Sequence, residues 1–145
     1  MIPNFYDGRF LPEGDHAATW NEVVERFGGN PKRKGFCDRL VRFLRTAKRC
    51  GFLRVYLFGS FISAKDNPGD VDLLWIHERD LDKSRLAKEC QDLLDYPLMK
   101  DREDWDMFCC SDDPFVINYF MDCWRKDKGA EKKPRGVIIL SLGEL

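Results

Sequence analysis

"RVYLFGSFISAKDNPGDVDLLWI", residues 54–76, contains two apolar segments joined by a polar one. The segments "RVYLF" and "VDLLWI" are short and rich in β-branched and aromatic residues, which is typical of buried strands. Gly59 and Ser60 follow the first segment, and after a nine-residue spacer Asp70 and Asp72 lead into the second. The stretch therefore predicts a strand, a tight corner, and a second strand that begins with two acids.

The segments before this stretch have helical periodicity. "TWNE", from Thr19 to Glu22, fits a capping box and predicts a short helix that runs to about Phe27. Apolar residues spaced by three and four positions predict a second helix from Lys34 to Gly51, with arginines on its other face.

The segments after it alternate between helical and strand patterns. We expect a helix from about Leu86 that ends at Pro97, a strand in "DWDMFCC" (104–110), a helix in "DDPFVINYFMDCW" (112–124) and a strand in "GVIIL" (136–140). This order predicts an α/β (α+β) fold, a mixed sheet of about four strands with helices packed against it. The last helix is expected to bury a stripe of Phe115 or Val116, Tyr119, Phe120, Cys123 and Trp124.

The length and composition suit one globular domain. With 145 residues, 43% of them hydrophobic, the chain is long enough for one core and short for two. We expect a single domain over 1–145, made of an N-terminal extension (1–33), a core (34–124), and a basic loop with a terminal strand (125–145).

Targeting signals and cysteine usage suggest a compartment. The N-terminus lacks the layout of a secretory signal, and no apolar run reaches the roughly 20 residues that span a bilayer. We therefore expect a cytoplasmic protein that does not contact membranes. The six cysteines include no C-x-x-C pair, and we expect reduced core thiols rather than zinc ligands or disulfides.

Charge is balanced overall but uneven along the chain. The net charge of -1 gives no general case for nucleic-acid binding, yet residues 31–54 hold nine basic residues and one acid. Acids predominate from 66 to 113, and a Lys/Arg-rich loop follows at 125–136. Each patch is either a solvated surface or part of a site for metals or polyanions.

Three D-x-D pairs occur in this aspartate-rich chain, at 70/72, 80/82 and 104/106, so their spacing alone does not identify a site. The pair at 80/82 lies at a strand-to-helix junction, where acids commonly cap helices. Asp70 and Asp72 open a strand, so both carboxylates are expected on one face, where their repulsion favours a bound cation such as Mg²⁺.

Asp104 and Asp106 are expected to share a face of the later strand by the same alternation. If that strand neighbours "VDLLWI", its acids converge on Asp70 and Asp72. We favour a functional role for Asp106 and a solvated position for Asp104. The corner at Gly59 and Ser60 adds a backbone that can approach a ligand closely, with amides and a hydroxyl suited to phosphate oxygens.

As a set, "LFGS", "DVDLL" and "WDMF" resemble the signature of the nucleotidyltransferase superfamily of DNA polymerase β, in particular its minimal single-domain bacterial members. The resemblance covers roughly Gly35 to Trp124 and implies a nucleotidyltransferase fold. The segment "GRFLPEGDHAATWNEV" with "RGVIIL" is also similar to a group of small nucleotidyltransferase-like proteins. One departure is "FISAKDN" after the Gly-Ser corner, where many minimal members have a small residue, Arg and Gly.

The resemblance implies a role for each matched residue. Asp70, Asp72 and Asp106 would be the catalytic carboxylates and ligands of two Mg²⁺ ions, with Mn²⁺ as a substitute. Gly59 and Ser60 would hold the β- and γ-phosphates of a nucleoside triphosphate such as ATP, with Lys65 as a further phosphate contact.

The implied function is the transfer of a nucleoside monophosphate from a triphosphate to a hydroxyl on RNA, such as tRNA, or on a partner protein. Minimal members often occur in toxin–antitoxin or defence modules, which makes that context an expectation here. The alternative is a non-catalytic antitoxin or adaptor that uses the same fold as a binding module.

Overall fold

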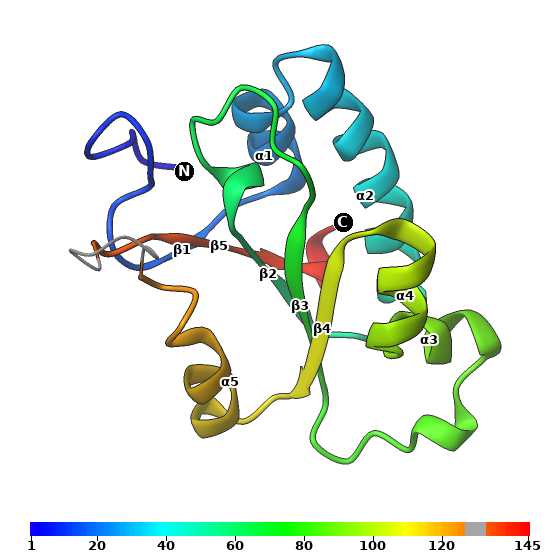
Figure 1. Cartoon of the computed structure of the whole chain (residues 1–145). Coiled ribbons are helices and arrows are strands. Elements are labelled where there is room, and N and C mark those ends of the chain that lie inside the picture. Colours follow the sequence, from blue (N-terminus) through cyan, green and yellow to red (C-terminus); the bar gives the residue numbers. More distant parts are fainter. Residues whose placement is uncertain (127–132) are drawn as a thin grey trace.

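A single five-stranded mixed sheet forms the centre of the molecule (Figure 1). The computed structural model describes residues 1–126 and 133–145. The strand order is β1-β5-β2-β3-β4, in which β2 is antiparallel to β5 and β3, while β1–β5 and β3–β4 are parallel. The strands are β1 (Asp15–Ala17), β2 (Arg54–Phe58), β3 (Asp72–His77), β4 (Asp106–Ser111) and β5 (Val137–Ser141).

The predicted α/β class is confirmed, with one strand more than expected. The sheet has five strands rather than about four. The additional strand is β1, which pairs with β5 through three residues. "DHA" has neither apolar alternation nor β-branched residues, so its strand conformation comes from its partner and not from its own sequence.

Helices cover both faces of this sheet, and α5 lies on the opposite side from α2 and α4 (Figure 1). Among the described residues, no helix has the length and apolarity needed to cross a membrane. The helices are α1 (Trp20–Phe27), α2 (Pro31–Arg49), α3 (Lys88–Leu93), α4 (Tyr96–Glu103) and α5 (Pro114–Met121), with short 3₁₀ turns η1 (Ser60–Ile62), η2 (Lys83–Arg85) and η3 (Leu142–Glu144).

Strand alternation divides the apolar side chains between two cores. Leu57 and Leu73 point to the larger core with α1 to α4, whereas Phe58 and Leu74 point to the smaller core with α5. Asp72 has the parity of Leu74, so its carboxylate lies on the α5 side, at the end of the sheet where β3 begins.

Side-chain caps set the starts of the first two helices. The predicted capping box of α1 is confirmed, with Thr19 and Glu22 each accepting from the other's backbone amide. α2 begins at Pro31, three residues earlier than expected, because Asn30 accepts from the amide of Arg33 and Pro31 suits the first turn.

The segment between β3 and β4 differs from its prediction. Pro97 does not end a helix; it lies in the first turn of α4, which Asp95 caps, so two short helices replace one. α4 ends at Glu103, its C-cap residue Asp104 has a left-handed φ of 59°, and β4 begins only at Asp106. The expectation that Asp104 and Asp106 share a strand face is therefore wrong.

The predicted buried stripe of α5 is confirmed only in part. Phe120 and Trp124 pack against the smaller core, but Phe115 and Tyr119 are each 88% exposed, and the helix buries Ile117 and Met121 instead. Nearly every residue of "PFVINYFM" is apolar, so its periodicity does not identify the face that contacts the sheet. The basic loop expected at 125–136 falls partly outside the described residues; where it is described, Lys126 pairs with Pro134.

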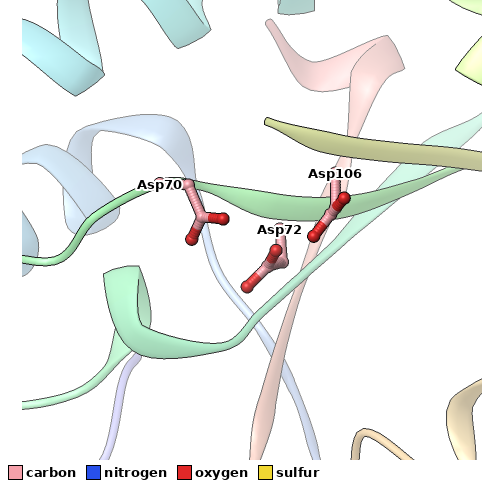
Figure 2. A group of neighbouring side chains, drawn as sticks. All are labelled: Asp70, Asp72 and Asp106. Carbon is pink, nitrogen blue, oxygen red and sulfur yellow. The ribbon is translucent and has the colours of Figure 1, made fainter. Parts of the chain in front are cut away.

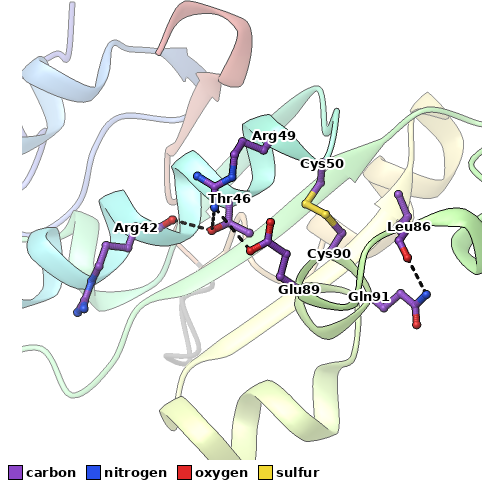
Figure 3. Close-up of a disulfide and its surroundings, with 8 residues drawn as sticks. All are labelled: Arg42, Thr46, Arg49, Cys50, Leu86, Glu89, Cys90 and Gln91. Atoms are coloured by element: carbon purple, nitrogen blue, oxygen red, sulfur yellow. Dashed lines mark hydrogen bonds and ion pairs between the residues drawn. A yellow bond between two sulfur atoms is a disulfide. The ribbon is translucent and has the colours of Figure 1, made fainter.

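A disulfide joins Cys50, at the end of α2, to Cys90 in α3 (Figure 3). The expectation that all six cysteines are reduced is wrong for this pair. The two Cα atoms are 5.7 Å apart although 40 residues separate them, so only the fold brings them together. Arg49 and Glu89, the preceding residues, add an ion pair of 3.7 Å between the same helices.

Loss of this disulfide is expected to destabilise the fold. For a loop of 40 residues, Cys50→Ser should lower the free energy of unfolding by about 2–4 kcal/mol, because the unfolded chain regains freedom. Urea unfolding of the non-reduced protein measures this difference. Cys123→Ser is the matched control, since Cys123 is free and exposed, and it should leave the midpoint unchanged.

Thiol counting tests the bond itself. The denatured, non-reduced protein should show four reactive thiols, and six would contradict the disulfide.

Candidate metal centre

Three carboxylates meet at the edge of the sheet where β3 and β4 begin. One oxygen from each of Asp70, Asp72 and Asp106 lies within 4.8 Å of the others. The parallel register pairs Asp72 with Asp106, and Asp70 precedes β3 by two positions. Figure 2 shows all three side chains projecting to the same side of the β3 ribbon. The spatial convergence expected from the sequence is thus present.

Gly59 packs against the carboxylate of Asp72. The antiparallel register places Phe58 opposite Asp72, so the next residue lies against the carboxylate. A Cβ at position 59 would come within 2.1 Å of Asp72 Oδ2, and the backbone there has a φ of +79°. Glycine is required at this corner for space and for conformation.

Burial and repulsion raise the pKa values of the first two acids. Asp72 is only 8% exposed, and burial, followed by the charges of Asp70 and Asp106, raises its pKa to about 7. Burial and the charge of Asp106 also raise the pKa of Asp70. A bound cation would relieve both effects, so the donor set fits a divalent metal with oxygen ligands.

Asp106 has two partners on α4 that the sequence did not reveal. The Tyr96 hydroxyl donates to Asp106 Oδ1 at 2.7 Å, and Lys100 Nζ lies 3.3 Å from the same oxygen. Burial alone would raise the pKa of Asp106, but the hydrogen bonds from Tyr96 and Lys100 outweigh it, and the pKa lies below its ordinary value. The bond to Asp106 in turn raises the pKa of Tyr96.

A cavity of about 450 Å³ opens beside the corner at Ser60. Lys65 lines it, as do Arg9 from the N-terminal segment and Arg135 from the residues before β5. The two guanidinium carbons lie 4.6 and 4.1 Å from the centre of the Phe10 ring. None of the described lining residues is acidic, so this basic cavity suits an anion next to the carboxylates.

Buried Arg33 fixes the loop between the corner and Lys65. Its guanidinium donates to the carbonyls of Phe61 at 2.6 Å, Ser63 at 2.8 Å and Lys65 at 2.5 Å. These bonds tie the loop to the first turn of α2, so the chain that follows Ser60 has one defined path.

The other predicted site residues fall into two groups. Gly59 lies against Asp72, and Ser60 and Lys65 line the basic cavity. Contact of these three residues with a nucleotide remains a prediction. Asp104 lies apart from the carboxylate group; its side chain is 93% exposed and is 3.6 Å from Lys100 Nζ. No sequence motif points to the remaining residues around the site, because each makes its contact only in the folded chain. These residues are Tyr96, Lys100, Arg9, Arg33 and Arg135.

The chain belongs to a family of unknown function (DUF6932), which matches residues 3–141. No curated protein and no solved structure matches it significantly.

The metal-free protein should lose stability as the pH rises towards 7. Asp72 has an ordinary pKa of 3.8 and a folded-state pKa of about 7. Between these values the unfolded carboxyl ionises while the folded one stays protonated, so folding becomes less favourable and levels off above pH 7. The lowered pKa of Asp106 acts only at more acidic pH.

Asp72→Asn should remove the part of this loss that comes from Asp72, which is at most about 4 kcal/mol because one pKa unit corresponds to about 1.4 kcal/mol; the part that comes from the raised pKa of Asp70 should remain. Urea unfolding at pH 5 and pH 8 with a chelator measures it, and added Mg²⁺ at pH 8 should stabilise the wild type but not Asp72→Asn. Asp104→Asn is the control and should keep the wild-type pH dependence. Identical curves for Asp72→Asn and wild type would contradict the assignment.

Gly59→Ala should damage the site more than backbone strain alone explains. Gly51 has the same φ of +79° but open space around its Cβ position, so Gly51→Ala is the control for a positive φ without the close contact, and it should cost about 1–2 kcal/mol. Gly59→Ala should cost about 1–3 kcal/mol more, because the new methyl displaces the Asp72 carboxylate. Mg²⁺ titration calorimetry should show weakened binding for Gly59→Ala only; equal effects of the two variants would refute the close contact.

Proposed function

We propose that this chain is a Mg²⁺-dependent nucleotidyltransferase, which transfers a nucleoside monophosphate from a triphosphate to a hydroxyl on RNA or on a partner protein. The convergence of Asp70, Asp72 and Asp106 beside the corner at Gly59 carries the proposal. A cluster of carboxylates next to a basic cavity is what transfer of a phosphoryl group between two oxygens requires.

The carboxylates supply the metal-binding half of this chemistry. Asp70 and Asp72 would hold two Mg²⁺ ions together with Asp106, and these ions would neutralise charge on the phosphate and on the attacking oxygen. The raised pKa values of Asp70 and Asp72 support this role, because each carboxylate lacks compensation in the metal-free chain. Asp106, which accepts a hydrogen bond from Tyr96, would face the acceptor hydroxyl and take up its proton.

The basic cavity supplies the phosphate-binding half. Ser60 joins the two halves, since it follows Gly59 and also lines the cavity. Lys65, Arg9 and Arg135 would neutralise the β- and γ-phosphates of the triphosphate. The two arginines give this chain a way to hold the leaving group although the residues after its Gly-Ser corner depart from the common pattern.

The acceptor is proposed to be a macromolecule. On the outer surface of α5, Phe115, Val116 and Tyr119 are exposed, and apolar residues gathered in this way are common in interfaces. A partner protein bound there fits a toxin–antitoxin or defence module in the cytoplasm. The same surface favours the second candidate function, an antitoxin or adaptor without catalysis.

Asparagine substitutions at Asp104 and Asp106 form a matched test of the proposed chemistry. With Mg²⁺, α-labelled triphosphates and candidate RNA or protein acceptors, Asp106→Asn should lower the rate of label transfer by at least about 100-fold, since several kcal/mol of transition-state stabilisation are lost. Asp104→Asn should retain wild-type transfer because its side chain points to solvent. A chelator should abolish transfer by wild type and by Asp104→Asn.

Calorimetry with Mg²⁺ and a non-hydrolysable triphosphate distinguishes the two candidate functions. An enzyme should bind both ligands, and an adaptor with a vestigial site should bind neither. Equal label transfer by Asp106→Asn and Asp104→Asn would refute the assignment of the site.

A further inference from the structure

The hydroxyl of Tyr96 lies beside Asp106, the carboxylate that would take the proton from the acceptor hydroxyl. Tyr96 Oη donates to Asp106 Oδ1 at 2.7 Å. A base must lie within about 2.6–3.2 Å of the hydroxyl whose proton it takes, and this pair already satisfies that condition. The other tyrosines are elsewhere: Tyr6 donates to the carbonyl of Pro134, Tyr56 is buried in the smaller core, and Tyr119 is exposed on α5.

We propose that Tyr96 is an acceptor, so that the protein attaches a nucleoside monophosphate to its own Tyr96 Oη. The inference rests on the proposed function and adds a modification site to it. Its ligand class is a nucleoside triphosphate, and its product is a tyrosine phosphodiester.

The reaction balances with no further reactant. Tyr96 Oη forms a bond to the α-phosphorus, the bond from that phosphorus to the bridging oxygen of the β-phosphate breaks, and pyrophosphate leaves with the electron pair. The phenolic proton passes to the Asp106 carboxylate, to which it is already hydrogen-bonded, and then to solvent. The triphosphate supplies the energy of the transfer.

The ring of Tyr96 is held in place for this attack. It stacks on Phe108, with ring centres 4.8 Å apart and planes inclined by 8°. Tyr96 is also the first residue of α4, whose N-terminus Asp95 caps by accepting from the amide of Leu98. A nucleophile fixed by packing and by a capped helix loses less freedom in reaching the transition state.

The surroundings leave room and suitable charge for a phosphate. Tyr96 is half-buried, and its hydroxyl lies near the surface, where a ligand can reach it. Lys100 lies one turn further along α4, with Nζ 3.3 Å from the oxygen that Tyr96 contacts. A cation at this distance favours the negative charge that gathers around the phosphorus.

Modification would limit itself to one nucleotide per chain. A nucleotide on Tyr96 removes the hydroxyl from Asp106 and fills the space in front of it. An external acceptor then has to compete with this attached group, so self-modification would also restrain transfer to other molecules.

Intact-mass spectrometry tests the proposal on the full-length protein. Wild type incubated with Mg²⁺ and each nucleoside triphosphate in turn should gain the mass of one nucleoside monophosphate, and peptide mapping should place it on Tyr96. Tyr96→Phe should gain no mass, and Tyr6→Phe, the matched control, should gain it as wild type does, because the Tyr6 hydroxyl contacts the carbonyl of Pro134. The rate per chain should not depend on protein concentration, because the geometry is intramolecular.

Peptide mapping of wild type decides the question even if Tyr96→Phe folds poorly, since label on any other residue, or on none, overturns the proposal. Calorimetry with Mg²⁺ and a non-hydrolysable triphosphate separates the two levels of inference. Wild type that binds both ligands yet gains no mass overturns self-modification and leaves the proposed function standing. Wild type that binds neither ligand overturns both.

Discussion

Repulsion among three carboxylates is the constraint around which this end of the molecule is organised. The oxygens of Asp70, Asp72 and Asp106 lie within 4.8 Å of one another, and burial together with this repulsion raises the pKa of Asp72 to about 7. The parallel pairing of β3 with β4 fixes the distance, because Asp72 and Asp106 are partners in the ladder. The sheet therefore holds an arrangement whose repulsion a bound cation, as proposed here, would relieve.

The chain compensates this charge unequally. Asp106 receives a hydroxyl and an ammonium group from α4, whereas the pKa values of Asp70 and Asp72 remain raised. On the other side of the corner, Arg9, Lys65 and Arg135 gather around a cavity with no acid among its described lining residues. Negative and positive groups are thus separated across Ser60, and the proposed metal–triphosphate ligand would complement both sides.

Local patterns predicted the parts of the structure whose conformation is set by nearby residues. The capping box at Thr19 and the two strands around Gly59 follow from helix capping and strand patterns. The convergence of Asp106 on Asp72 was expected only if their strands are neighbours, and the parallel pairing of β3 with β4 meets that condition. Features decided by distant contacts were missed: β1 exists through its pairing with β5, and the partner of Cys50 lies 40 residues away. Tyr96 was missed because Pro97 was interpreted as the end of a helix when it belongs to the start of one.

The contact between Gly59 and Asp72 links two positions that are 13 residues apart in the sequence. Any side chain at 59 would occupy the volume of the carboxylate at 72, so an acid at 72 and a side chain at 59 exclude each other in this fold. The two positions can therefore be compared as a pair when family members are sorted. A sequence that keeps both Gly and Asp retains room for the carboxylate at 72, and one that has gained a side chain at 59 has lost that room.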